Sequence, residues 1–188
     1  IFSFFFYDPP TTAIYTLYPT RRSSDLNSLV QVDSDTYALA YSGPNGDGFI
    51  STFTISSDGS TITEVDSLEH DTTRGLSNSL VQVDSDTYAL AYVGADRDGF
   101  ISTFTISADG STITEVDSLE HYTTEITHNF LVQVDSDTYA LAYTQNISAH
   151  GYLSTFTTVR YGNILAVNSQ SQENNLKYDT VPCPRQPP

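Results

Sequence analysis

Apolar and polar residues alternate along most of the chain with a period of two. In residues 36–41 (TYALAY), Tyr37, Leu39 and Tyr41 are separated by alanines. Strict alternation of this kind predicts a β-strand with one large face and one small face. The small face of such a sheet can stack closely against the large face of the next.

Three further strands are predicted around this one, at residues 28–32, 49–56 and 61–70. The dipeptide Asp58-Gly59 is a strong hairpin signal between the last two of them. The last strand carries charged residues among its apolar ones on both faces. That mixture is typical of an exposed edge strand, which is thereby protected from pairing with other chains.

This four-strand unit is repeated. Residues 28–70 return as residues 79–121 with five differences, and again in a more diverged form from residue 130, with a period of 51 residues. A period near 50 without a helical pattern indicates an array of small β units. We therefore divide the chain into repeats at residues 27–77, 78–128 and 129–180, followed by a proline-rich tail at 181–188.

The repeats resemble the four-stranded blades of β-propellers, which have about this length. The resemblance concerns the architecture, because the chain has no tryptophan and no Gly-Gly pair. The repeat text also resembles arrays in bacterial proteins from environmental samples, which imply no activity. We expect an all-β fold of tandem antiparallel blades forming a partial, open β-propeller. A β-solenoid and tandem sandwiches are the alternatives.

Residues 1–26 differ in character from the repeats. Within them, residues 19–26 (PTRRSSDL) resemble the conceptual translation of a sequencing adapter. The competing interpretation is a secretory signal, but the segment lacks a basic n-region and an A-x-A-like cleavage site. We interpret it as an artefactual, non-native segment in front of a fragment of a larger protein. For that protein we predict an extracellular or cell-surface location.

The chain is strongly acidic, with a formal net charge of −16 and a single lysine, Lys177. Binding to nucleic acid or to an anionic membrane requires basic residues that neutralise phosphates. The composition therefore argues against both partners. One cysteine, Cys183, excludes an internal disulfide framework. No apolar run is long enough for a spanning helix, so we expect no membrane insertion.

Pairs of aspartates recur in the first turn of each repeat. Aspartate oxygens are ligands that Ca²⁺ prefers, although each turn offers only two of them. Aspartate is also common in turns because it bonds the nearby backbone. We expect ordinary turns in the main, no required cofactor, and weak Ca²⁺ binding at most; the candidate residues are Asp33, Asp35, Asp84, Asp86, Asp135 and Asp137.

Two histidines, His70 and His121, end the last strand of the first two repeats. In one class of propeller a histidine at this place bonds an aspartate in the second turn as a structural latch. His70 with Asp98 resembles that pair, and His121 repeats it. A general base or a metal site is the alternative. Identical repetition favours the latch, because catalysis needs one constellation of different groups.

The copies vary most in their second turn, while the strands stay constant. Near-identical repeats present the same loop chemistry several times, which favours multivalent contacts over one reaction centre. We therefore predict a non-catalytic scaffold or binding module whose variable loops contact a protein or carbohydrate, with self-association through open blade edges. The alternative is a fragment of a propeller enzyme of the lyase, lactonase or quinoprotein type, whose catalytic residues lie in other blades.

Overall fold

The computed structural model describes residues 27–159 and 162–172 of the chain. The predictions for residues 1–26 and 181–188 lie outside these residues. The described chain forms three consecutive four-stranded sheets. The first contains β1 (Ser28–Gln31), β2 (Thr36–Ser42), β3 (Gly48–Ile55) and β4 (Ile62–Asp71). The second contains β5 (Leu76–Gln82), β6 (Thr87–Val93), β7 (Gly99–Ile106) and β8 (Ile113–Tyr122). The third contains β9 (Ile126–Gln133), β10 (Thr138–Gln145), β11 (Gly151–Val159) and β12 (Asn163–Gln172).

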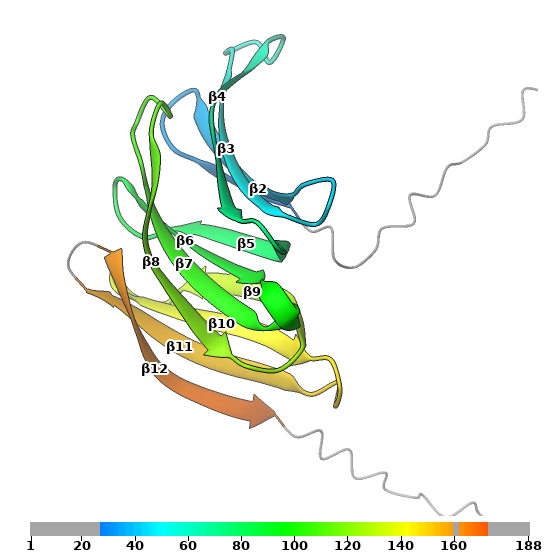
Figure 1. The fold of residues 1–188 in the computed structure, drawn as a ribbon. Helices are drawn as coiled ribbons and strands as arrows, with labels where there is room; N and C mark the ends of the chain where they lie inside the picture. The colour runs from blue at the N-terminus through cyan, green and yellow to red at the C-terminus, as the bar shows by residue number, and fades with distance from the viewer. Residues whose placement is uncertain (1–26, 160–161, 173–188) are drawn as a thin grey trace, which may run out of the picture.

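Each sheet is an antiparallel meander in which the strands lie in chain order. A three-residue 3₁₀ segment, Ala95–Arg97, forms part of the second turn of the second sheet, between β6 and β7. The sheets follow one another as blades, and the first strands β1, β5 and β9 lie side by side (Figure 1). The fourth strands β4, β8 and β12 form the opposite edges of the sheets. The predicted all-β fold of tandem antiparallel blades is confirmed.

The packing between the first and second blades follows the alternation of large and small residues. Tyr88, Leu90 and Tyr92 of β6 are buried in one cluster with Ala38, Ala40 and Ile50 of the first blade. Alanine side chains leave room for the tyrosine rings, so the two sheets can approach closely. The large face of one blade thus covers the small face of the blade before it.

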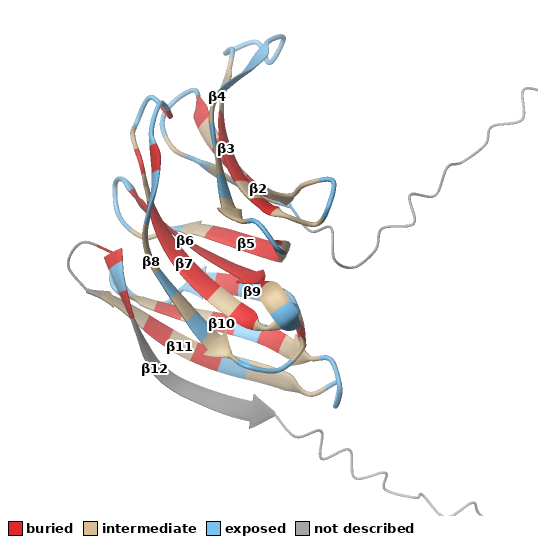
Figure 2. Ribbon diagram, viewed as in Figure 1, coloured by how far each residue is buried: buried red, intermediate tan, exposed pale blue. Residues whose placement is uncertain are grey.

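The junction between the second and third blades repeats this arrangement one period later. Tyr139, Leu141 and Tyr143 of β10 pack with Ala89, Ala91 and Ile101. Figure 2 shows the result, since buried residues are most continuous in β5, β6 and β7 of the second blade. The second blade is therefore the one whose two faces are both covered by described residues.

Hydrogen bonds between blades add specificity to the apolar contacts. On the first strands, the Leu80 amide donates to Ser28 Oγ at 2.9 Å, and the Leu131 amide donates to Ser79 Oγ at 2.9 Å. Between the third strands and the next hairpin turn, the buried Thr52 hydroxyl donates to the Gly110 carbonyl oxygen at 2.6 Å. Thr103 makes the same bond to Gly162 at 2.5 Å.

Candidate functional site

The two repeated histidines lie between blades. The His70 ring at the end of β4 packs edge-on against Tyr92 and Phe104 of the next blade, with centroid distances of 4.6 and 5.9 Å. His121 repeats this at 5.1 Å from Tyr143 and 5.6 Å from Phe156. A glycine faces each ring, because a Cβ at Gly99 would lie 2.6 Å from His121 Cε1. The histidines therefore fill slots shaped by aromatic rings and backbone.

Within the described part of the chain, neither ring nitrogen of His70 or His121 has a hydrogen-bond partner, although all four nitrogens are buried. Burial lowers the pKa of His70 from 6.5 to about 4, while the nearby Asp71 carboxylate acts in the opposite direction. Burial alone lowers the pKa of His121 to about 4. Both rings are thus neutral at pH 7, because a charged imidazole would be desolvated there without a partner.

The hydrogen bond expected of a His70–Asp98 latch is not formed. Asp98 instead lies beside Glu120, whose pKa is raised by loss of solvation, by a hydrogen bond with Asp98 and by its charge. The backbone closes the second turn without the histidine, since the Asp98 amide bonds the Ala95 carbonyl at 2.9 Å. The contribution of His70 to the junction is consequently packing against aromatic rings.

The paired aspartates of the first turns bond their own loops. Asp33 and Asp84 each accept the amide of the following serine at 2.7 Å, and Asp135 does so at 2.5 Å. Asp35 and Asp86 accept weaker bonds from the next threonine hydroxyl, at 3.4 and 3.2 Å. The Asp137 carbonyl accepts the Thr158 amide at 2.9 Å. Among the described residues, no group of three or more acidic, histidine or cysteine side chains could hold a metal ion.

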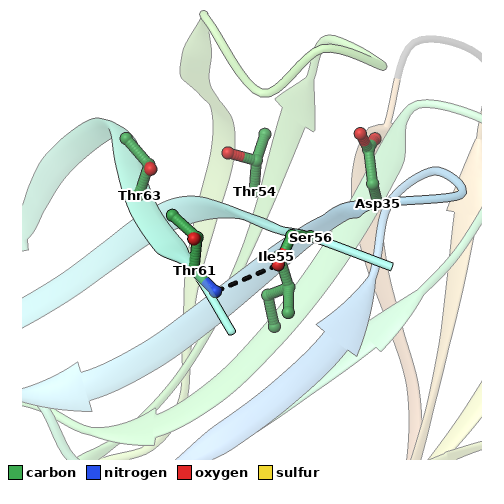
Figure 3. A pocket seen from close by; sticks show the side chains of 6 residues that line it. All are labelled: Asp35, Thr54, Ile55, Ser56, Thr61 and Thr63. Atoms are coloured by element: carbon green, nitrogen blue, oxygen red, sulfur yellow. Dashed lines mark hydrogen bonds between the residues drawn. The ribbon is translucent and has the colours of Figure 1, made fainter. Parts of the chain in front are cut away.

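A shallow hollow of about 170 Å³ lies beside Asp35 on the first blade (Figure 3); its lining residues are Asp35, Thr54, Ile55, Ser56, Thr61 and Thr63. Two of these lining residues are joined by a hydrogen bond, in which the Thr61 amide donates to Ser56 Oγ at 3.0 Å. One period later, the counterpart of Ile55 is Ile106, which the first blade buries. The hollow is therefore blade surface that no described residue covers.

The junction of the first and second blades also brings acidic groups together. Loss of solvation raises the pKa of Glu115 on β8, a hydrogen bond from Ser102 lowers it, and the charges of Asp71 and Asp117 raise it further. The hydroxyl of Tyr92 has a raised pKa for similar reasons, burial being the largest. Asp71 Oδ1 accepts the amides of the link residues Thr73 and Arg74 at 2.8 and 2.9 Å.

Of the two junctions formed by described residues, the first has this acidic group and the second does not. One period after Asp71 stands Tyr122, and one period after Glu115 stands Ala166. Sequence reasoning missed Glu115, because it was read as part of a charged edge strand. The available signal was the replacement of each acid one period later, by Tyr122 in the second repeat and by Ala166 in the third. A unique pair of carboxyls, one with a raised pKa, is the kind of group that acid–base chemistry uses.

No protein-family model matches the sequence, and no curated protein matches it. The solved structures that are similar in fold include the following three. A candidate 6-phosphogluconolactonase from Bacteroides fragilis has a TM-score of 0.53 and 16% identity, over 86% of this chain and 38% of that one. The periplasmic gluconolactonase of Pseudomonas aeruginosa has a TM-score of 0.56 and 13% identity, over 73% of this chain and 39% of that one. An α-L-arabinanase from Penicillium chrysogenum has a TM-score of 0.54 and 12% identity, over 84% of this chain and 51% of that one.

These matches correct one prediction. The chain was expected not to be an enzyme, yet the three similar structures are two lactonases and a glycosidase. The apparent identity of the copies misled the sequence argument, because Tyr122 in the second copy and Ala166 in the third replace two acids of the first junction. The chain spans 38% to 51% of the length of these structures. No described helix is long and apolar enough to cross a membrane.

Proposed function

We propose that this chain supplies three blades of a β-propeller hydrolase acting on a sugar lactone or a glycoside. The observation that carries the proposal is the fold it shares with two lactonases and an arabinanase. The acidic group of Asp71 and Glu115 at the first junction also supports the proposal. Both acids are replaced one period later, so packing between blades does not require them. An extracellular or periplasmic location fits the periplasmic gluconolactonase of Pseudomonas aeruginosa.

The chemistry common to both substrate classes is attack by water on a carbon bonded to oxygen. It needs one group that takes a proton from the water and one that delivers a proton to the leaving oxygen. Glu115 suits the acid, because its raised pKa favours the protonated form. Asp71 suits the base, since its Oδ1 is fixed by two amides and its Oδ2 lies beside Gly94, a residue without a side chain.

The test is hydrolysis by the whole chain, with sugar lactones followed by pH-stat and aryl arabinofuranosides followed by absorbance. Asp71→Asn and Glu115→Gln should each lower kcat by about 100-fold, a typical loss for one acid or base. Glu64→Gln is the matched control, because Glu64 holds the position of Glu115 on the first blade. The control should keep the full rate.

Two results would contradict the proposal. One is the absence of hydrolysis above the buffer rate for both substrate classes. The other is equal rates in Asp71→Asn, Glu115→Gln and Glu64→Gln, which would place the chemistry away from the junction.

A further inference from the structure

The first blade has a large face that no described residue covers. Tyr37, Leu39 and Tyr41 are only partly buried, whereas Tyr88, Leu90 and Tyr92 at the same positions of the second blade are buried. On the first strand, Leu29 is 58% exposed and its counterpart Leu80 is 3% exposed. We refer to Leu29, Tyr37, Leu39 and Tyr41 as the front face. It is the surface that covers the preceding blade at both junctions within the chain.

The third blade has the complementary small face open. Ala142 is exposed and Ala140 is partly buried, and Leu153, which pairs with Ala142, is 47% exposed. Their counterparts in the first two blades are buried under the next blade. Phe130 and Val132 flank the alanines on the first strand and are also exposed. We refer to Phe130, Val132, Ala140, Ala142 and Leu153 as the back face.

The polar groups of the two open faces match as well. Thr52 and Thr103 donate to the carbonyls of Gly110 and Gly162 in the following blade. One period further, the Thr155 hydroxyl makes no such bond among the described residues. Gly59 is the counterpart of Gly110 one period earlier. The turn at Gly110 lies against the first blade, since a Cβ there would be 2.9 Å from Thr36 Cγ2, whereas a Cβ at Gly59 would meet nothing within 4 Å. The donor and the acceptor turn of a third junction are thus both present and unused.

One substitution distinguishes the third blade at this surface. Ser28 and Ser79 bond the first strand of the next blade, but Phe130 replaces them and is 65% exposed. A phenylalanine at this place loses the hydrogen bond and gains apolar area, and the matching position of the front face is the exposed Leu29. An exposed apolar patch of this kind marks an interaction surface.

We propose that two copies of this chain dock head to tail, the front face of each on the back face of the other, and close a ring of six blades. The occupant is specified by the chain itself, because both internal junctions consist of the same two faces. Two copies make two identical junctions and leave neither face open. Six blades also lie within the range of four to eight that propellers adopt. At −16 per copy, the charges oppose docking, so salt should strengthen it.

The first measurement is the mass of the whole chain by sedimentation velocity between about 1 and 100 µM in 150 mM salt, conditions that screen charges beyond about 8 Å. We expect a discrete dimer. A monomer throughout would overturn the proposal, and so would species that keep growing with concentration, since those would be open filaments or unspecific aggregates.

The second measurement is a complementation between two variants at exposed positions. Leu29→Asp damages the front face and Leu153→Asp damages the back face. Each alone should be monomeric, with dimerisation weakened by at least about 100-fold, because an unpaired charge is buried in both junctions. An equimolar mixture should form a heterodimer, because the back face of one variant and the front face of the other are intact.

The complementation separates head-to-tail docking from other arrangements. If Leu29→Asp still dimerises alone, the contact is back to back, and if Leu153→Asp does so, it is front to front; both results overturn the proposal. Ile147→Asp is the matched control, because Ile147 is exposed in the second turn and belongs to neither face. It should dimerise like the unchanged chain. Circular dichroism of each variant at pH 7 confirms that the blades remain folded.

Discussion

The buried ring nitrogens of His70 and His121 predict a loss of stability between pH 7 and pH 5. Well above pH 6.5, His70 and His121 are neutral in both the folded and the unfolded chain, so they add no pH dependence there. Between pH 6.5 and about 4, the unfolded chain takes up protons that the folded chain excludes. The free energy of unfolding must therefore fall as the pH falls through this range.

The magnitude follows from the two pKa values. With 6.5 unfolded and about 4 folded, each histidine costs about 2 kcal/mol at pH 5, or about 4 kcal/mol for both. For a chain of this size that corresponds to a decrease of roughly 10 °C in the thermal midpoint. Glu115 acts in the opposite direction. Because its pKa is raised in the folded chain, the folded chain takes up this proton more readily, so the contribution of Glu115 to the free energy of unfolding rises as the pH falls.

The assay is urea unfolding at pH 7.0, 6.0 and 5.0, followed by circular dichroism. The double variant His70→Leu with His121→Leu should show little fall in the free energy of unfolding over this range. His128→Leu is the control, because His128 is exposed and both buried rings remain. If the double variant loses as much stability as the control, the two junctions do not exclude protons and the reasoning is refuted.

Two further predictions concern the junctions between blades. Leu90→Ala should lower the free energy of unfolding by about 2–5 kcal/mol, because Leu90 is fully buried. Leu39→Ala, at the matched position of the first blade, should lower it by about 1 kcal/mol or less in the monomer. Equal losses in urea unfolding would contradict the packing described above. Thr52→Val should cost about 1–3 kcal/mol by removing the donor to Gly110, while Thr155→Val should leave monomer stability unchanged. A loss in Thr155→Val as large as that in Thr52→Val would show that the bond to the next blade is not its cause.

The strands and their stacking could be predicted from the sequence because they depend on local signals. Alternation in residues 36–41 defines both faces of β2, and Asp58-Gly59 forms the expected turn, with Gly59 at φ +70°. The charged pattern of residues 61–70 marks the exposed edge strand β4. These features repeat with the period, so each was visible more than once.

Other features depend on contacts between blades and have no local signal. Ser77 and His128 adopt positive φ values of 53° and 58° at bulges near the start of β5 and β9, a conformation that is uncommon for residues other than glycine. The predicted bond between His70 and Asp98 fails because the ring lies between aromatic side chains. The raised pKa of Glu115 likewise requires the neighbouring sheets and the charge of Asp71.

The central claim is that each blade is stabilised by the large face of the next, so that only the second blade is covered on both sides by described residues. Amide hydrogen exchange of the monomeric variant Leu153→Asp tests it most directly. Opening free energies should be highest in β6 and β7, and lower in the matched strands β2, β3, β10 and β11. Equal protection of all three blades in the monomer would contradict the claim.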